Sequence, residues 1–196
     1  MEDLTGITGN SYVVVDLQKI KRNVEKIRAH IGENVKFLPV LKGATCGHGL
    51  EEIAEFLVSE CQFDMLCVGH TIEAERIRNF GVNCDILVLG GTPFNNIPYV
   101  VENKITTTLS NADYARALSA EAVKRGTTAK VHIKINSGLG RMGAKPGDEL
   151  AGCRGLILRV PTLIFLIQQK STPPSSNRRQ LHLTAALHRS KRQALR

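Results

Sequence analysis

The sequence lacks any apolar stretch of eighteen or more residues, so no transmembrane helix is predicted. It also lacks a secretory signal, because residues 1–10 are polar, carry two acids and have no basic start or apolar centre. We therefore expect a cytoplasmic protein without a membrane partner. The 196 residues are 42% hydrophobic and 22% charged, which indicates a globular chain long enough for one domain.

The cysteines show no pattern of paired ligands or disulfides. There are five, an odd number, and no Cys-x-x-Cys occurs among them: Cys46, Cys61, Cys67, Cys84 and Cys153. Neither a disulfide framework nor a zinc site is therefore predicted. Most of these thiols are expected to be buried small hydrophobic groups in a reducing compartment.

Acidic residues are missing beyond Glu149. Residues 151–196 hold nine of the 26 Lys and Arg, which leaves 17 basic against 18 acidic residues in the rest of a chain of net charge +8. About five acids are expected in a segment of this length. We therefore divide the chain into a domain over residues 1–147 and a basic tail over residues 148–196. The tail is expected to be either disordered or translated from a different reading frame than the domain. The tail would attract phosphate only non-specifically, because it has one aromatic residue, Phe165, and no recognisable nucleic-acid-binding module.

Two hydrophobic periods alternate along the first 140 residues. Period-two or continuous apolar runs predict strands, and apolar residues at helical spacing predict helices, with Asp16 as the N-cap of the first helix. The predicted strands are residues 11–16, 35–41, 63–69, 84–90, 104–109 and 130–135, and the predicted helices are residues 17–31, 50–58, 72–80 and 112–124.

The strands begin at about residues 35, 63, 84, 104 and 130, a repeat of 20 to 28 residues. This rhythm is typical of βα units and predicts an α/β fold with a parallel sheet. An open doubly wound sheet and a (β/α)₈ barrel both fit it. Five units cannot close a barrel, which needs about 250 residues. The rhythm stops after residue 150, where Arg159 and Pro161 interrupt the last apolar run.

Lys42 ends the apolar run of residues 35–41 and opens a glycine-rich turn that continues to Gly49. Ligands bind beyond the carboxyl ends of parallel strands, and a desolvated lysine there can form a Schiff base with a carbonyl. By position alone, however, most lysines at strand ends are simply solvated.

A second glycine-rich segment, KINSGLGRMG, spans residues 134–143 and contains a G-x-G-x-x-G pattern. A dinucleotide-binding fingerprint must open a helix and needs an acid about 20 residues later. Lys145-Pro146-Gly147 disfavours that helix, and no such acid exists. The segment is better interpreted as a turn that presents Arg141, a fixed cation suited to an oxyanion or phenolate.

Other candidate residues have plain structural explanations. Cys46 and His48 are too few to indicate a metal site, and turn or packing roles are favoured for His48 and His70. Glu73 and Glu75 begin a predicted helix, where acids interact favourably with the helix dipole.

Four segments, in order, resemble alanine racemase. The first is KIKRNVEKIR in the first predicted helix, which contains Asn23. The second is LKGATCGHG (41–49), which is similar to the family's cofactor segment Val-Lys-Ala-Asn-Ala-Tyr-Gly-His-Gly. The other two are EAERIR (73–78), which matches Glu-Ala-x-x-Leu-Arg, and KINSGLGRMG (134–143), which matches Lys-x-Asp-Thr-Gly-Met-Gly-Arg-x-Gly. The resemblance covers about residues 11–145. It implies a partial (β/α)₈ TIM-type barrel like the racemase N-terminal domain, with pyridoxal 5'-phosphate (PLP) as cofactor and an amino acid as substrate.

The resemblance also implies roles for individual residues. Lys42 would bind PLP and act as the base on one face of the substrate Cα. Arg141 would approach the phenolic oxygen of PLP and the substrate, and Lys134 would be carbamylated and help fix Arg141. Three positions depart from the family: Cys46 replaces the tyrosine that reaches the phosphate, Asn136 replaces an aspartate and Gly43 an alanine. A thiol is a weaker donor, so phosphate binding should suffer at Cys46.

The resembled enzymes interconvert L-alanine and D-alanine, which supplies D-alanine for peptidoglycan. They are homodimers, and their C-terminal β domain provides the second catalytic base, a tyrosine. Residues 151–196 match no such element, so we expect a chain truncated or frameshifted after about residue 147, with very low activity. A racemase for serine, ornithine or lysine, and a non-catalytic PLP-binding protein, remain alternatives.

Overall fold

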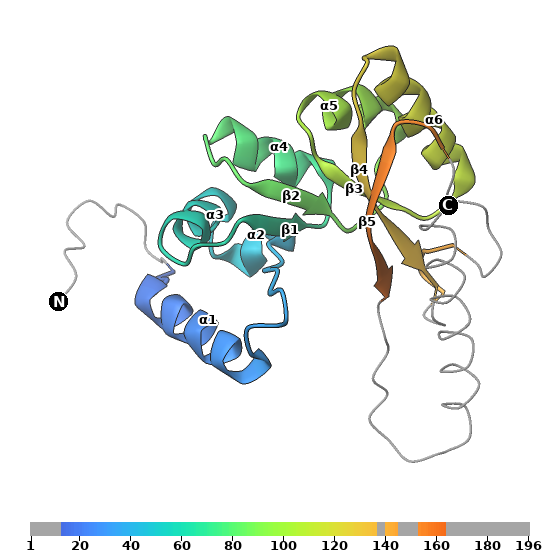
Figure 1. Cartoon of the computed structure of the whole chain (residues 1–196). Coiled ribbons are helices and arrows are strands. Elements are labelled where there is room, and N and C mark those ends of the chain that lie inside the picture. The colour runs from blue at the N-terminus through green and yellow to red at the C-terminus, as the bar shows by residue number, and fades with distance from the viewer. Residues whose placement is uncertain (1–12, 137–139, 145–152, 164–196) are drawn as a thin grey trace, which may run out of the picture. The chain divides into compact units, whose positions relative to one another are not determined.

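The computed structural model describes residues 13–136, 140–144 and 153–163 (Figure 1). The chain divides into two compact units between Cys84 and Asp85. The first unit contains α1 (Leu17–Ile31), α2 (Lys42–Gly47), α3 (Leu50–Ser59), β1 (Met65–Val68) and α4 (Thr71–Asn79). The second contains β2 (Asp85–Val88), η1 (Phe94–Asn96), α5 (Ile97–Glu102), β3 (Thr106–Leu109), α6 (Ala112–Lys124), β4 (Ala129–Ile135) and β5 (Leu156–Leu163).

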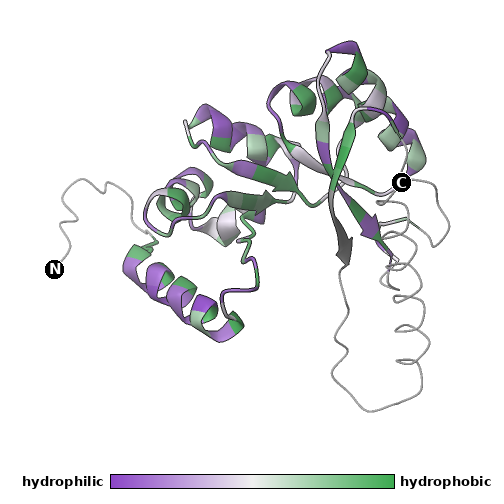
Figure 2. Ribbon diagram, in the orientation of Figure 1, coloured by the Kyte–Doolittle hydropathy of each residue, from purple (hydrophilic) through white to green (hydrophobic). Residues whose placement is uncertain are grey.

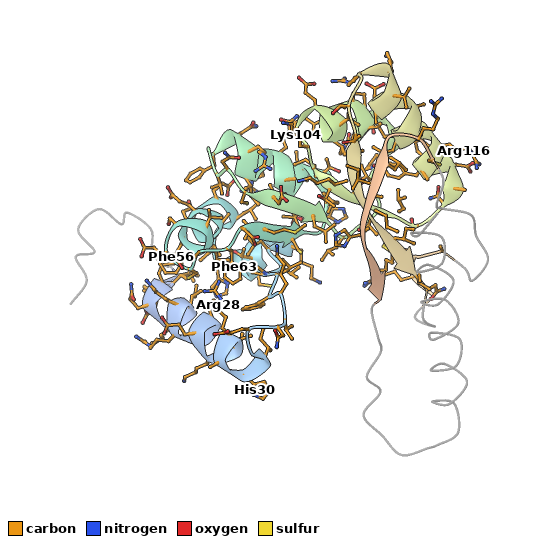
Figure 3. All side chains as sticks on the ribbon, in the orientation of Figure 1. Arg28, His30, Phe56, Phe63, Lys104 and Arg116 are labelled. Carbon is orange, nitrogen blue, oxygen red and sulfur yellow. The ribbon has the colours of Figure 1, made fainter. Side chains whose placement is uncertain are left out.

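The first helix forms where the spacing of apolar residues predicts it. The Asp16 side chain accepts a hydrogen bond from the Lys19 N–H at 3.0 Å, which confirms the predicted N-cap. Most of α1 is hydrophilic in Figure 2, and Val24 is its buried residue. Figure 3 shows Arg28 beside Phe63, with the guanidinium carbon 4.5 Å from the ring centre, a cation–π contact that holds α1 to the rest of its unit.

Aliphatic side chains of α3, β1 and α4 form the core of the first unit. All four residues of β1 are buried, as in a parallel strand covered on both faces. The fully buried side chains of this core are Leu50, Ala54, Leu66, Val68, Ala74 and Ile77. This core places the carboxyl end of β1 beside the turn that follows Lys42.

The second unit is built on a parallel sheet. Strand β2 pairs with β3, β3 with β4, and β4 with β5, all in the parallel sense. Helices α5 and α6 connect these strands and contribute buried aliphatic residues. The strands predicted over 63–69, 84–90, 104–109 and 130–135 correspond to β1, β2, β3 and β4, which confirms the parallel α/β class.

Strand register places several polar residues of this sheet on one face, whereas Thr107 alternates to the other face. Thr108 lies opposite His132, and side chains alternate along a strand, so Lys130, His132 and Lys134 share the face of Thr108. The Asp85 carboxylate, at the start of β2, lies 3.2 Å from the Lys130 amine. Lys134 is one residue from the carboxyl end of β4, on the side of a parallel sheet where ligands bind.

Two predicted strands do not form as expected. Residues 13–16 of the predicted strand 11–16 are not in a strand, and residues 11–12 lie outside the described part; Val13 is 79% exposed. Residues 35–41 form only one bridge, from Val40 to Cys67. Pro39 has no N–H to donate, so a continuous ladder is interrupted there. An apolar run becomes a strand only where a neighbour supplies hydrogen bonds.

The structure also adds elements that the hydrophobic pattern missed. Beyond residue 150, where the βα rhythm was expected to stop, β5 pairs with β4, and Ile133 lies opposite Pro161. Proline is tolerated at the edge of a sheet, where its missing N–H faces away from the ladder. Helix α5 was too short for its period to be recognised. None of the described helices is long and apolar enough to cross a membrane.

Candidate functional site

Lys42 lies at the carboxyl end of the segment that runs beside β1. The Leu41 N–H donates to the Cys67 carbonyl at 2.7 Å, and the Cys67 N–H donates to the Pro39 carbonyl at 2.9 Å. Lys42 follows immediately and is exposed. Lys42 therefore follows a single parallel bridge, at Val40, and not the full strand predicted over residues 35–41.

The residues after Lys42 form a left-handed turn. Gly43, Ala44, Thr45 and Cys46 all have φ between 49° and 63° and ψ between 34° and 45°. Glycine adopts this conformation freely, whereas each residue with a Cβ costs about 1–2 kcal/mol. Hydrogen bonds within the turn offset part of that cost: Thr45 Oγ1 donates to the Gly49 carbonyl at 2.9 Å.

Glu73, from the first turn of α4, holds the lysine turn from outside. Its carboxylate is buried and accepts three backbone hydrogen bonds. Gly43 N–H donates to Oε1 at 2.7 Å, and the N–H groups of Gly69 and His70 donate to Oε2 at 2.8 and 3.0 Å. One carboxylate thus joins the turn after Lys42 to the turn after β1.

In the second unit, Lys134 is the second residue of interest. Its side chain is only 4% exposed. Burial lowers the pKa of Lys134, because a charged amine is poorly solvated there, and the positive charge of Arg141 lowers it further. Among the described residues no carboxylate is paired with this amine. Lys134 therefore becomes neutral at a lower pH than a surface lysine does.

Arg141 lies on the turn that returns to β4, and it is exposed. The turn is closed by hydrogen bonds from Ala144 N–H to the Lys134 carbonyl at 2.8 Å and from Asn136 N–H to the Ala144 carbonyl at 3.0 Å. Gly143 has φ +123°, and a Cβ there would lie 2.7 Å from Asn136 N. Only glycine fits so close to the strand backbone.

Each unit brings together part of the predicted site. The first holds Lys42, Cys46 and His48 on one turn; Cys46 is exposed, and His48 Nδ1 lies 2.7 Å from the Thr45 carbonyl, which gives His48 the turn role expected of it. The second holds Lys134 and Arg141. Residues 140–144 are not helical, and the segment around Lys145-Pro146-Gly147, where the fingerprint would need a helix, lies outside the described residues. Across the described ranges, no three His, Cys, Asp or Glu side chains are grouped as a metal site requires.

Sequence reasoning missed the importance of two residues. Glu73 was explained by the helix dipole alone, because nothing in the sequence connects it to Gly43, thirty positions earlier. His132 was not singled out, yet it is buried on the same face of β4 as Lys134. The alternation in KVHIKI could have indicated that second case, since residues two apart share a face.

The chain is similar in sequence to known proteins over most of its length. The family described as alanine racemase, N-terminal domain, matches residues 15–189. Alanine racemase 1 of Caldanaerobacter subterraneus subsp. tengcongensis is 39% identical over 153 residues, covering 74% of this chain and 39% of that protein. The chain thus spans well under half the length of this relative.

Two solved structures are similar in fold. Alanine racemase from Clostridium difficile 630, in complex with cycloserine, has a TM-score of 0.87 at 25% identity and covers 97% of this chain and 54% of that one. Alanine racemase from Bacillus anthracis with bound L-Ala-P has a TM-score of 0.75 at 26% identity and covers 89% and 46%. These matches confirm the partial barrel implied by the resemblance, and the chain belongs to the family of the alanine racemase N-terminal domain.

Proposed function

We propose that this chain provides the cofactor-binding part of a PLP-dependent alanine racemase, with Lys42 as the residue that holds the cofactor. The family is PLP-dependent, and LKGATCGHG is similar to its cofactor segment. The observation that carries the proposal is the position of Lys42, exposed at the carboxyl end of a parallel pairing and followed by a turn that a buried carboxylate holds in place.

The residues present fit the chemical groups of PLP. Among the described residues, no hydrogen bond or ion pair engages the Lys42 amine, so it is available to the cofactor's aldehyde. Arg141 offers an exposed, permanent cation that suits a phenolate oxygen. The exposed Cys46 thiol can donate to a phosphate, more weakly than the tyrosine of the resembled family.

Bound PLP supplies an electron sink that makes the α-proton of an amino acid acidic. In the proposed role, the Lys42 amine takes that proton from one face of the substrate Cα and can return it to the same face. The resemblance assigns Arg141 to the phenolic oxygen of the cofactor, whose negative charge its guanidinium would stabilise. Racemisation also needs a proton donor on the opposite face. We assign that donor to none of the described residues, and therefore expect the 196-residue chain assayed alone to racemise L-alanine very slowly.

We also propose that Lys134 is carbamylated. Its amine would attack carbon dioxide to form the carbamate with loss of a proton, and the product is an anion that can pair with Arg141. Burial supports the proposal, because the lowered pKa of Lys134 leaves more of the neutral amine that reacts. Incubation with ¹³C-bicarbonate should give a carbamate carbon NMR signal that Lys134→Met abolishes; a signal of equal strength in the variant would reject the assignment.

The decisive experiment for the proposed function is covalent trapping. The full chain is incubated with PLP, reduced with borohydride, digested and analysed by peptide mass spectrometry. We expect the adduct on Lys42, and its loss in Lys42→Arg, which keeps the charge. Lys36, whose amine already pairs with Asp64 at 2.8 Å, serves as an internal control. An unmodified Lys42 in the wild-type chain would refute the proposal.

The same preparation separates two functions. Racemisation of L-alanine by the loaded chain at an enzyme-like rate would show a complete catalyst and contradict our expectation. PLP on Lys42 without turnover would agree with a cofactor-binding part that needs further residues, or with a non-catalytic PLP-binding protein. Titration of L-serine, L-ornithine and L-lysine against the loaded chain, read from the cofactor absorbance, then tests whether alanine is the preferred ligand.

A further inference from the structure

Glu73 is buried and fully hydrogen-bonded, which an interaction with the helix dipole alone would not require. It is 8% exposed, and both carboxylate oxygens are engaged by backbone donors. The bonds to Gly69 and His70 are local, since these residues immediately precede α4. The bond to Gly43 is not local: at 2.7 Å it reaches a segment far away in the sequence, directly after Lys42.

The turn that receives this bond needs external support. Its three residues after Gly43 carry side chains in the left-handed region, so the unfolded chain rarely adopts this conformation. The Thr45 hydroxyl has its two possible acceptors, the carbonyls of Ala44 and Gly49, within the turn itself and so does not fix the turn to the remainder of its unit. Glu73 supplies that connection at the first residue of the turn.

Glu73 also lies against the root of the lysine side chain. A Cβ built on Gly69 would lie 3.2 Å from Lys42 Cβ and 3.3 Å from Glu73 Oε2. The Gly69 backbone, the Lys42 Cβ and the Glu73 carboxylate are thus neighbours without spare space between them. A displacement of the carboxylate would change the position from which the lysine side chain extends.

We propose that Glu73 is a positioning residue for Lys42: its carboxylate fixes the left-handed turn, and so directs the amine toward the cofactor. The proposal rests on the proposed function, in which Lys42 binds PLP. It differs from the simple helix-dipole role, in which any acid in the first turn of α4 would serve and the lysine would be unaffected.

Two substitutions separate these roles. In Glu73→Gln, the carboxamide has one accepting oxygen, and its NH₂ group faces a backbone donor, so either Gly43 or the Gly69–His70 pair loses its partner. Glu73→Asp keeps the charge and can still accept from the start of α4, but it is one methylene shorter and should not reach Gly43. Glu75→Gln, on the same helix, makes the same charge change without any of these bonds and is the matched control.

The experiment compares the full chain and these variants in the PLP trapping reaction. We expect the rate of adduct formation at Lys42 to fall about tenfold in Glu73→Gln and Glu73→Asp, as for loss of one charge-assisted hydrogen bond. Circular dichroism of the bound cofactor, per mole of adduct, should also fall, because it depends on a fixed lysine. Glu75→Gln should match the wild type. Wild-type rate and dichroism in Glu73→Asp would overturn the proposal, even if Glu73→Gln fails to fold.

A measurement without cofactor tests the role of Glu73 separately from PLP binding by Lys42. Amide hydrogen exchange of the unloaded chain should accelerate at Gly43 and Ala44 in Glu73→Asp, while α3 and β1 keep their protection. If wild-type Lys42 takes no PLP but this local change is seen, the proposed function fails and the link to the turn stands. If Lys42 takes PLP and the exchange at Gly43 is unchanged, Glu73 does not position it.

Discussion

The two lysines of interest are placed in opposite ways. Lys42, in the first unit, is exposed and is followed by a left-handed turn that a side chain holds from outside. Lys134, in the second unit, is buried near the end of a strand, and alternation along β4 fixes its direction. The comparison shows that strand pairing can orient a buried lysine by alternation alone, whereas a left-handed turn needs a specific tertiary partner.

The energetic costs also differ. Around Lys42 the cost is conformational, about 1–2 kcal/mol for each of the three non-glycine residues in the left-handed turn, offset by hydrogen bonds. At Lys134 the cost is the desolvation of a charge, which the lowered pKa partly relieves. Each of the following substitutions tests one side of this contrast.

The largest expected effect concerns the close return of the chain beside β4. Gly143→Ala should lower the free energy of unfolding by about 3 kcal/mol, because a Cβ would lie 2.7 Å from Asn136 N at a positive φ. Gly126→Ala is the control: its φ is +61°, nothing lies within 4 Å, and a loss of about 1 kcal/mol is expected. Equal losses in urea unfolding would show that the close approach is unimportant.

The next effect depends on pH. Because the pKa of Lys134 is lowered in the folded chain, the unfolded chain binds more protons between that pKa and the ordinary lysine pKa, so stability rises with pH across this window. Lys134→Met removes the buried charge and should raise the unfolding free energy by about 1–2 kcal/mol at neutral pH in bicarbonate-free buffer. This advantage should shrink through the same window, as measured by denaturation from pH 7 upward. An advantage independent of pH would contradict the assignment.

Two threonines of β3, Thr106 and Thr108, test how the sheet of the second unit tolerates buried hydroxyl groups. The Thr108 hydroxyl donates to the Val88 carbonyl at 2.7 Å, so Thr108→Val should destabilise by about 1 kcal/mol. The buried Thr106 hydroxyl has no hydrogen-bond partner within the described ranges, so Thr106→Val should stabilise by about 1 kcal/mol. Thermal unfolding of both variants decides: an undiminished stability of Thr108→Val would show that the hydrogen bond to Val88 contributes nothing, and a destabilised Thr106→Val would contradict the cost of the unpaired hydroxyl.

The smallest effect concerns the strain beside Lys42. Ala44→Gly relieves a residue with φ +49° and should raise the unfolding free energy by about 0.5 kcal/mol, after the greater entropy of the unfolded chain is included. The same substitution at exposed Ala120, within α6, should lower it by about 1 kcal/mol. A loss of stability at both positions would mean that the left-handed turn is not strained.

Sequence reasoning succeeded where one local pattern was sufficient. Helix α1 and its Asp16 cap, and strands β1 to β4, follow from apolar spacing and from a side chain that bonds three residues away. It failed where a partner decided the outcome. Residues 13–16 have strand-like composition but are not in a strand, and β5 forms although Arg159 and Pro161 interrupt its sequence, because β4 offers a hydrogen-bonding edge.

The sequence by itself determined the α/β class, the family, the position of Lys42 after an apolar run and the glycine-rich turn that carries Arg141. These depend on residue types and spacings within short segments. Only the tertiary structure decided that the lysine turn is left-handed, that Lys134 is buried, and that Glu73 joins Gly43 to Gly69. The reason is physical: burial and backbone strain depend on which distant segments meet, and no local pattern records that a carboxylate in one helix will satisfy an N–H group thirty residues earlier.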